Sequence, residues 1–204
     1  MDYKPDNRFT MLAAALVVGG TLFTATQVHA ANVIIAPSSS VVTIGDTLTV
    51  DVRFNGTDMP SYFGGNTTYL AAFDFNLTYD ASVFSYTGYM LGNSLGELTI
   101  DADDMSSGGN IAGVVSLAEV SYLTDFTSIQ TGTFTLATLS FEALYSGESV
   151  FTLDSTSLFG DESANAIQPI IGSASVQVVP VPSAGLLMFT ALIGLASLRR
   201  GRAN

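Results

Sequence analysis

Three aspartates stand close together in a glycine-containing segment, and their side chains are the best suited in the chain to bind a metal ion. Asp101, Asp103 and Asp104 offer carboxylate oxygens, which are the ligands that calcium prefers. The spacing differs from that of an EF-hand loop, because the sixth position is Ser106 instead of glycine and the twelfth is Ala112 instead of glutamate. The sequence therefore leaves two interpretations open, a calcium site and a solvated acidic loop.

Carboxylates are also the groups from which the central part of the chain would have to build a catalytic site. The sequence has no cysteine, and its one histidine, His29, lies in a segment that we expect to be removed. Thiol nucleophiles, Ser-His-Asp triads and ordinary zinc sites are thereby excluded. A carboxylate pair could hydrolyse glycosidic bonds, but the many acidic residues provide such pairs by chance. A polysaccharide-active enzyme is the less favoured hypothesis, and we expect no cofactor beyond the possible calcium.

The charge of the central part excludes nucleic-acid binding. Residues 31–178 carry sixteen carboxylates and one cation, Arg53, so their net charge is −15. The Lys and Arg side chains that bind phosphate backbones are almost absent. We expect a soluble domain whose copies repel one another at low salt.

Aromatic rings are further candidates for ligand binding, because a tyrosine or phenylalanine face can stack on a sugar. Tyr62 and Phe63 lie in a glycine-containing loop, Tyr69 ends that loop, and Tyr122 follows an expected strand. Each ring could equally pack in the core or at its rim.

β-Strands must position these side chains. Apolar and polar residues alternate along 47–54 and again along 73–79. This period of two indicates strands with one buried side and one solvent-facing side. Further strands are expected at 32–36, 83–90, 97–100, 111–120, 149–153 and 174–178.

The strand expected at 133–141 breaks the alternation. Its large apolar residues change side between Leu136 and Leu139. A β-bulge at Ala137 and Thr138 would return both ends of the strand to the core. With eight to ten such strands and frequent Gly, Asp, Asn and Ser turns, residues 31–178 are predicted to form an all-β, antiparallel jelly-roll β-sandwich without disulfides.

The first thirty residues are typical of a secretory signal peptide. Lys4 and Arg8 precede an apolar stretch at 11–23, and a small-residue pattern ends at Ala30. The apolar stretch is too short to cross a bilayer comfortably. We expect an N-terminal signal helix, cleavage after Ala30 and export of the protein.

The end of the chain contains a second apolar segment. Residues 183–198 carry no charge, and Arg199, Arg200 and Arg202 follow directly. As a helix the segment would measure about 24 Å, just enough to span a membrane with its flanking residues. The arginines would stay cytoplasmic, which places everything before Pro180 on the exported side.

Residues 179–204 resemble the PEP-CTERM sorting signal of Gram-negative bacteria, which combines a proline-containing motif, a transmembrane helix and an arginine cluster. Val179, Pro180, Val181 and Pro182 keep both prolines of the usual Val-Pro-Glu-Pro motif and have valine in place of glutamate. The resemblance implies cleavage near the prolines by an exosortase, followed by release or surface attachment. A plain C-terminal membrane anchor is the alternative.

The central part resembles cohesin domains. The resemblance rests on VVTIGDTLTVDVRF (41–54), AAFDFNLTYDASVFSYTGY (71–89) and TGTFTLATLSFEA (131–143), and best on a strand that ends in Tyr-Asp before a turn and a hydrophobic anchor. A proline often follows this aspartate in cellulosomal members, where the present chain has Ala81. Cohesins are jelly-roll sandwiches related to carbohydrate-binding modules, and cellulosomal cohesins hold the dockerin modules of polysaccharide-degrading enzymes.

The resemblances together imply an exported, non-enzymatic binding module. Its expected partners are a dockerin-like surface protein or a polysaccharide, an exosortase, and the membrane through the C-terminal helix before processing. The expected destination is the cell surface, the extracellular matrix or the medium. The alternative is a structural component of the matrix or envelope that acts by self-association.

Overall fold

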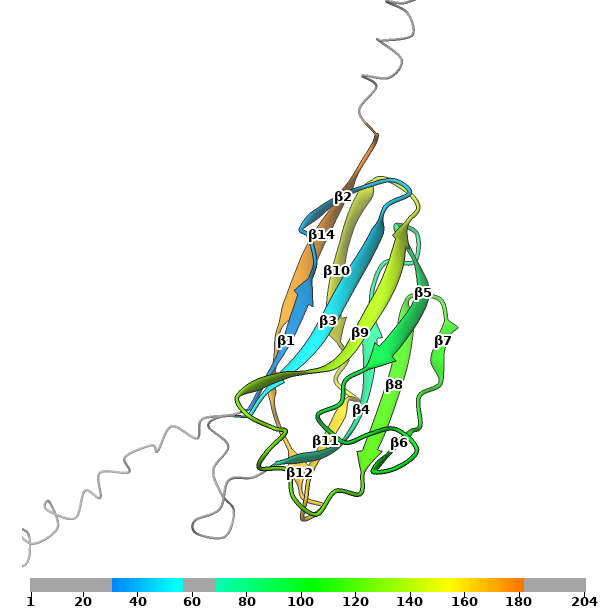
Figure 1. The fold of residues 1–204 in the computed structure, drawn as a ribbon. Helices are drawn as coiled ribbons and strands as arrows, with labels where there is room; N and C mark the ends of the chain where they lie inside the picture. The colour runs from blue at the N-terminus through cyan, green and yellow to red at the C-terminus, as the bar shows by residue number, and fades with distance from the viewer. Residues whose placement is uncertain (1–30, 57–68, 182–204) are drawn as a thin grey trace, which may run out of the picture.

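The computed structural model describes residues 31–56 and 69–181 (Figure 1). The expected signal peptide with Ala30, the helix at 183–198 and the arginine cluster lie outside these residues. Within the described residues no helix is long and apolar enough to cross a membrane. The described part consists of strands and turns, so the prediction of an all-β fold is confirmed.

Two β-sheets pack face to face, as Figure 1 shows. The first sheet has the order β13-β1-β3-β9-β5. Its strands are β1 (Asn32–Pro37), β3 (Thr47–Asn55), β5 (Phe84–Leu91), β9 (Thr133–Ala143) and β13 (Ile170–Ile171). All of its pairs are antiparallel except β1 with β13.

The second sheet follows the order β12-β11-β4-β10-β14-β2, and β8 pairs with β4 and also with β6 and β7. Only β14 and β2 pair in parallel. The strands are β2 (Val41–Thr43), β4 (Leu70–Thr78), β6 (Ala102–Asp104), β7 (Gly108–Ile111), β8 (Val114–Ser121), β10 (Gly147–Leu153), β11 (Leu158–Asp161), β12 (Ala166–Ile167) and β14 (Ser173–Val179).

The core lies between the sheets and is built by the alternation that the sequence displays. Every second residue of β3 is fully buried, and β4 contributes Phe73, Phe75 and Leu77 from the opposite sheet. Phe141 of β9 lies at the centre of an aromatic cluster, with its ring centroid 5.1 Å from that of Phe151 in β10. Burying these side chains is the main stabilising contribution, because the chain has no disulfide.

The expected bulge is present but lies one residue earlier. The register of β9 on β3 passes directly from Ala137 to Thr135, so Leu136 is the extra residue. Leu136 and Ala137 are both buried, which accounts for the change of side in the sequence. The Leu136 carbonyl accepts a 2.7 Å hydrogen bond from the amide of Gly92, which anchors the bulge to the end of β5.

The strand expected at 97–100 is wrong. These residues form turns, in which the Glu97 carbonyl accepts hydrogen bonds from the amides of Ile100, Asp101 and Ala102. The apolar residues that suggested a strand are exposed, with Ile100 at 67%. Local hydrogen bonds therefore satisfy a backbone that has no neighbouring strand to pair with, apart from a single bridge at Leu98.

The strand expected at 111–120 is present for most of its length as β8, but its first residues form the turn of a hairpin with β7. β7 ends at Ile111 and β8 begins at Val114, with Gly113 in the turn at a φ of 83°. Glycine adopts this conformation without steric cost, so the reversal of the chain occurs there. The apolar run continues through the turn, which is why the sequence pattern alone suggested one strand.

Candidate binding surface

The outer face of the second sheet carries small side chains where β11, β4 and β8 lie side by side. Ala72 of β4 pairs with Val120 of β8 and with Gly160 of β11. Two residues further along, Asp74 pairs with Ala118 and with Leu158. Because side chains alternate along a strand, the intervening residues turn into the sandwich. The small residues Ala72, Ala118 and Gly160 therefore lie on the outer face, beside larger side chains of the same rows.

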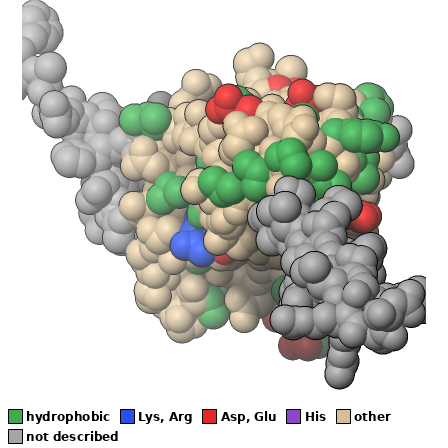
Figure 2. Space-filling model, turned by 90° about the horizontal axis from the view of Figure 1, so that it is seen from above, with side chains coloured by type: hydrophobic (Ala, Val, Ile, Leu, Met, Phe, Trp, Pro, Cys, Tyr) green, Lys and Arg blue, Asp and Glu red, His purple; other side chains and the backbone are tan. Residues whose placement is uncertain are grey.

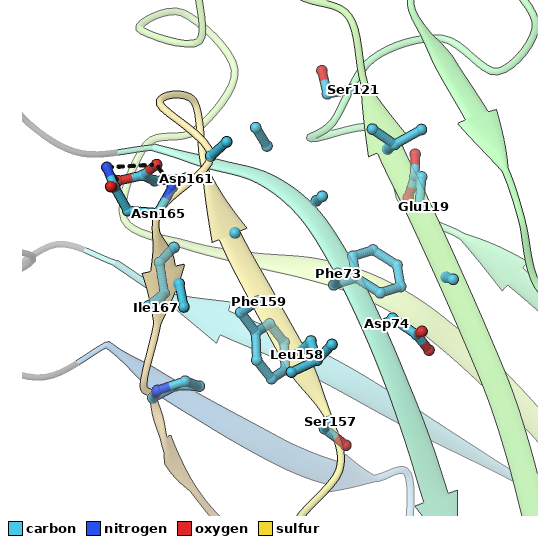
Figure 3. Close-up of a pocket in the computed structure, with 18 of the residues that line it drawn as sticks. Phe73, Asp74, Glu119, Ser121, Ser157, Leu158, Phe159, Asp161, Asn165 and Ile167 are labelled. Atoms are coloured by element: carbon cyan, nitrogen blue, oxygen red, sulfur yellow. Dashed lines mark hydrogen bonds between the residues drawn. The ribbon is translucent and has the colours of Figure 1, made fainter.

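A groove of about 900 Å³ follows these strands and the segment 164–171 (Figure 3). Met105 and Leu158 are 68% and 65% exposed where they line it, so apolar surface is open to solvent. The lining contains no Lys or Arg but includes four carboxylates, namely Asp74, Glu119, Asp161 and Glu162. Such a surface favours a ligand with an apolar anchor and positive charge.

Two of these carboxylates organise one end of the groove. Asp161 is only 8% exposed and accepts hydrogen bonds from the amides of Ser163 and Asn165 and from the Asn165 side chain, as Figure 3 shows in part. Glu162 accepts a 2.7 Å hydrogen bond from the amide of Tyr69, the residue before β4. The loop after β11 is thus held in one conformation, which lowers the entropy cost of binding.

Glu119 of β8 lies on the inward side, where it pairs with Phe73 of β4 and Asp104 of β6. It is 2% exposed, and its Oε1 atom has no hydrogen-bond partner within the described part of the chain. Burial raises the pKa of Glu119 to about 7, and the negative charge of Asp104 adds to this effect. A substantial fraction of Glu119 is therefore protonated at neutral pH.

The three aspartates singled out in the sequence do not converge. Asp103 accepts a 2.9 Å hydrogen bond from the Tyr122 hydroxyl, whereas Asp104 accepts one of 2.7 Å from the Tyr89 hydroxyl. Successive residues of β6 point to opposite faces, which separates these carboxylates. No group of three or more His, Cys, Asp or Glu side chains that could hold a metal ion occurs in residues 31–56 and 69–181. The structure thus does not bring Asp101, Asp103 and Asp104 together at a calcium site.

The candidate aromatic residues have different surroundings. Tyr69 stacks on Phe126 with ring centroids 5.9 Å apart, so it packs at the rim of the core. Tyr122 is 60% exposed, and its hydrogen bond to Asp103 raises the pKa of its hydroxyl. Tyr62 and Phe63 lie outside the described residues.

The first residue of the predicted sorting motif belongs to the last strand of the sandwich. Val179 is the last residue of β14, and its carbonyl accepts a hydrogen bond from the amide of Ile44. Pro180 and Val181 follow as exposed residues, and Pro182 lies outside the described part.

The turn after β4 has the features on which the resemblance to cohesins rests. The Asp80 side chain accepts a 2.8 Å hydrogen bond from the amide of Ser82, and its carbonyl accepts from the amides of Val83 and Phe84. Val83 and Phe84 are buried, so they anchor the turn in the core. The chain crosses here from the second sheet to the first.

Comparison with known families decides what this fold is. Residues 32–178 match the model of the cohesin domain. The chain belongs to the cohesin domain family. A search of curated proteins found no match.

Solved cohesin structures share the fold of this cohesin domain at low sequence identity. A cohesin module from a Clostridium perfringens family 33 glycoside hydrolase has 15% identity and a TM-score of 0.57, covering 74% of this chain and 98% of that one. A cohesin-dockerin complex from Clostridium thermocellum has 16% identity and a TM-score of 0.55, covering 74% of this chain and 99% of that one. A non-cellulosomal cohesin from the archaeon Archaeoglobus fulgidus has 12% identity and a TM-score of 0.54, covering 76% of this chain and 96% of that one.

The groove is a feature that the sequence did not reveal. A weak signal was present, because small residues alternate with buried ones at Ala72 in one strand and at Ala118 in another. Without the register, nothing indicated that these strands are neighbours or that Gly160 completes the row.

Proposed function

We propose that this cohesin domain is an exported, non-catalytic module that binds a dockerin-like protein module through the groove on β4, β8 and β11. The proposal rests on the groove, because the groove combines solvent-exposed apolar surface with the preorganised loop after β11. Family membership supports a protein as the partner, and one of the similar structures is a cohesin-dockerin complex.

The charge of the groove indicates the chemistry of the partner. Asp74 and Glu162 are the two exposed carboxylates of its lining and have no compensating cation there, and the described residues contain Arg53 as their single Lys or Arg. Arg53 lies on the other sheet and pairs with Asp51 at 2.6 Å. We therefore expect an apolar side chain of the partner between Met105 and Leu158, with Lys or Arg beside it.

Site-specific crosslinking tests this proposal, because the chain has no cysteine of its own. Leu158→Cys places a photo-crosslinker at the groove, and Thr49→Cys places the same group on the outer face of the first sheet. Extracellular protein of the source organism is the binding material. We expect one protein to crosslink at position 158 and not at 49, and its peptides to be identified by mass spectrometry.

A blocking variant gives the matched control. Ala118→Arg fills the groove, and it should abolish the crosslink at position 158 when introduced beside Leu158→Cys. A crosslinked protein that survives Ala118→Arg, or that reacts equally at position 49, contradicts the proposal. Groove-dependent retention of a purified polysaccharide would assign a glycan instead, and self-association lost in Ala118→Arg would assign a structural role.

We further propose that the tail at 179–204 delivers the domain to the cell surface or matrix through an exosortase. The support is the order of motif, uncharged segment and arginine cluster in the sequence. Mass spectrometry of the extracellular protein should find Ala31 at its start and an end near Pro182. A mature chain that retains Arg199 contradicts processing and favours a permanent anchor.

A further inference from the structure

Apolar side chains gather at the end of the sandwich from which the C-terminal segment leaves. They come from β2, from the turns after β2 and β9, and from the residue that ends the described part. The members are Val41, Ile44, Leu144, Tyr145 and Val181, with exposed fractions of 52%, 37%, 36%, 67% and 64%. We call them the apex patch. Figure 1 shows these segments at one end, and Figure 2, which looks down on that end, shows hydrophobic side chains in a band across it.

The backbone beneath the apex patch is firmly held. The amide of Ile44 donates to the Val179 carbonyl at 3.1 Å, and the amide of Gly45 donates to the Ala143 carbonyl at 2.7 Å. The amide of Leu144 donates to the Val83 carbonyl at 2.8 Å. The part of the patch that lies on β2 and on the two turns is therefore fixed in shape, and its exposure is not the result of a loose turn. Exposed apolar side chains gathered on such a scaffold mark a candidate interaction site.

The length of the remaining chain indicates what covers the patch. Only Pro182 separates Val181 from the uncharged segment 183–198. Two peptide units span about 7 Å, so a membrane-spanning helix that starts at residue 183 would hold the apex within about 10 Å of the bilayer surface. Tyr145 suits this place, because tyrosine rings concentrate at membrane interfaces.

We propose that the apex patch rests on the outer surface of the membrane that holds the C-terminal segment, with a lipid bilayer as its occupant, until the tail is cut. The proposal rests on the membrane-spanning tail of the proposed function and is independent of the groove. The contact keeps the Val179–Pro182 motif at the membrane surface. A membrane enzyme would meet the motif there.

The charges around the patch select the lipid. Asp46, Asp80, Glu142 and Glu148 are all exposed. Asp46, Glu142 and Glu148 belong to the turns and strand ends next to the patch, and Asp80 lies in the turn after β4, whose Val83 carbonyl accepts the hydrogen bond from Leu144. They repel anionic lipids, and the repulsion reaches about 8 Å at physiological salt. The ammonium group of phosphatidylethanolamine is attracted instead. The contact should therefore be strongest on zwitterionic vesicles.

The test uses the full chain in vesicles of phosphatidylethanolamine and phosphatidylcholine. Ser146→Cys places an environment-sensitive fluorophore beside the patch, and Ser163→Cys places it at the opposite end of the sandwich. We expect the label at 146 to shift its emission to the blue and to lose most of its quenching by aqueous acrylamide, a neutral quencher, on the vesicles. The label at 163 should remain fully quenched. Adding phosphatidylglycerol should restore part of the quenching at 146.

Variants and a wash separate the possible outcomes. Leu144→Ser with Tyr145→Ser should restore quenching at position 146, whereas Ile100→Ser, an exposed apolar residue outside the patch, should not. If the chain resists extraction with alkaline carbonate but the label at 146 is quenched as strongly as that at 163, the apex proposal fails while the tail proposal stands. If carbonate releases the chain, the membrane-spanning tail fails and the apex proposal fails with it. Ala118→Arg should leave the protection at 146 unchanged.

Discussion

Tyr89 of β5 and Asp104 of β6 connect the two sheets, because the tyrosine hydroxyl donates a 2.7 Å hydrogen bond to Oδ2 of the aspartate. Both residues lie along the side of the sandwich where β5 is an edge strand and β6 pairs with β8. Burial raises the pKa of Tyr89, and its hydrogen bond to Asp104 adds to the rise. The tyrosine therefore remains a donor throughout the neutral range.

Removing this donor should weaken the edge of the sandwich. We expect Tyr89→Phe to lower the free energy of unfolding by about 1–2 kcal/mol, because hydrogen bonds to charged acceptors contribute about 1.5–3 kcal/mol and this one is exposed to solvent, which weakens it. Urea denaturation monitored by circular dichroism measures the change. Tyr145→Phe is the control, since Tyr145 is 67% exposed in the apex patch. Equal effects of the two variants would contradict a special role for the connection.

Glu119 should make the domain less stable as the pH rises. Its pKa is raised to about 7 in the folded chain from 4.5, so between these values the folded state holds a proton that the unfolded state has released. The stabilisation is complete below about pH 4.5, is lost as the pH rises to about 7, and does not change further above that. We expect Glu119 to lower the free energy of unfolding by about 2–3 kcal/mol between pH 5 and pH 8.

Glu119→Gln is the variant that isolates this effect, because glutamine cannot ionise. Its unfolding free energy should change much less than that of the natural chain between pH 5 and pH 8. Asp104 acts in a separate window, because hydrogen bonds from Ser106 and Tyr89 outweigh its burial and lower its pKa below 3.8. Its contribution is lost only at lower pH. Parallel pH profiles for the natural chain and Glu119→Gln would refute the assignment.

Gly92 should tolerate no side chain. A Cβ atom at this position would lie 2.0 Å from the carbonyl oxygen of Thr135, next to the bulge at Leu136. Gly92→Ala must therefore shift backbone, and we expect a loss of at least about 2 kcal/mol of stability.

Gly160 provides a matched comparison for Gly92. A Cβ atom there would meet Ala72 Cβ and the Asn165 carbonyl oxygen at 3.9 Å, which is ordinary contact. Gly160→Ala should leave the melting temperature unchanged or raise it slightly, because alanine loses less backbone entropy than glycine. If both variants melt together, the clash at Gly92 is relieved by a movement that the structure does not show.

Phe141 should be the most sensitive position of the core. Its ring centroid lies 5.0 Å from that of Tyr79, 5.1 Å from Phe151 and 6.4 Å from Phe84. We expect Phe141→Ala to cost about 3–5 kcal/mol, because the rigid surroundings cannot fill the cavity. Met90→Ala, at a residue that is 70% exposed, should cost less than about 0.5 kcal/mol by the same thermal denaturation.

The sequence by itself determined those features that each strand encodes locally. Leu48 and Phe54 are buried on one side of β3 because the alternation of a strand assigns alternate side chains to opposite faces. The bulge was also predictable, since the change of side between Leu136 and Leu139 is visible in the order of residues. Its exact place was missed by one position, because the hydrogen bond that holds it comes from Gly92, just after another strand, β5.

The tertiary structure alone decided which of these strands are neighbours, and therefore every feature built across strands. The groove needs Ala72, Ala118 and Gly160 on three adjacent strands, and nothing local to any of them specifies that register. Glu119 acquires its raised pKa because the fold buries it and because β6 sets the negative charge of Asp104 against it. Long-range pairing is settled by how all the buried faces fit together at once, and a single stretch of residues does not contain that information.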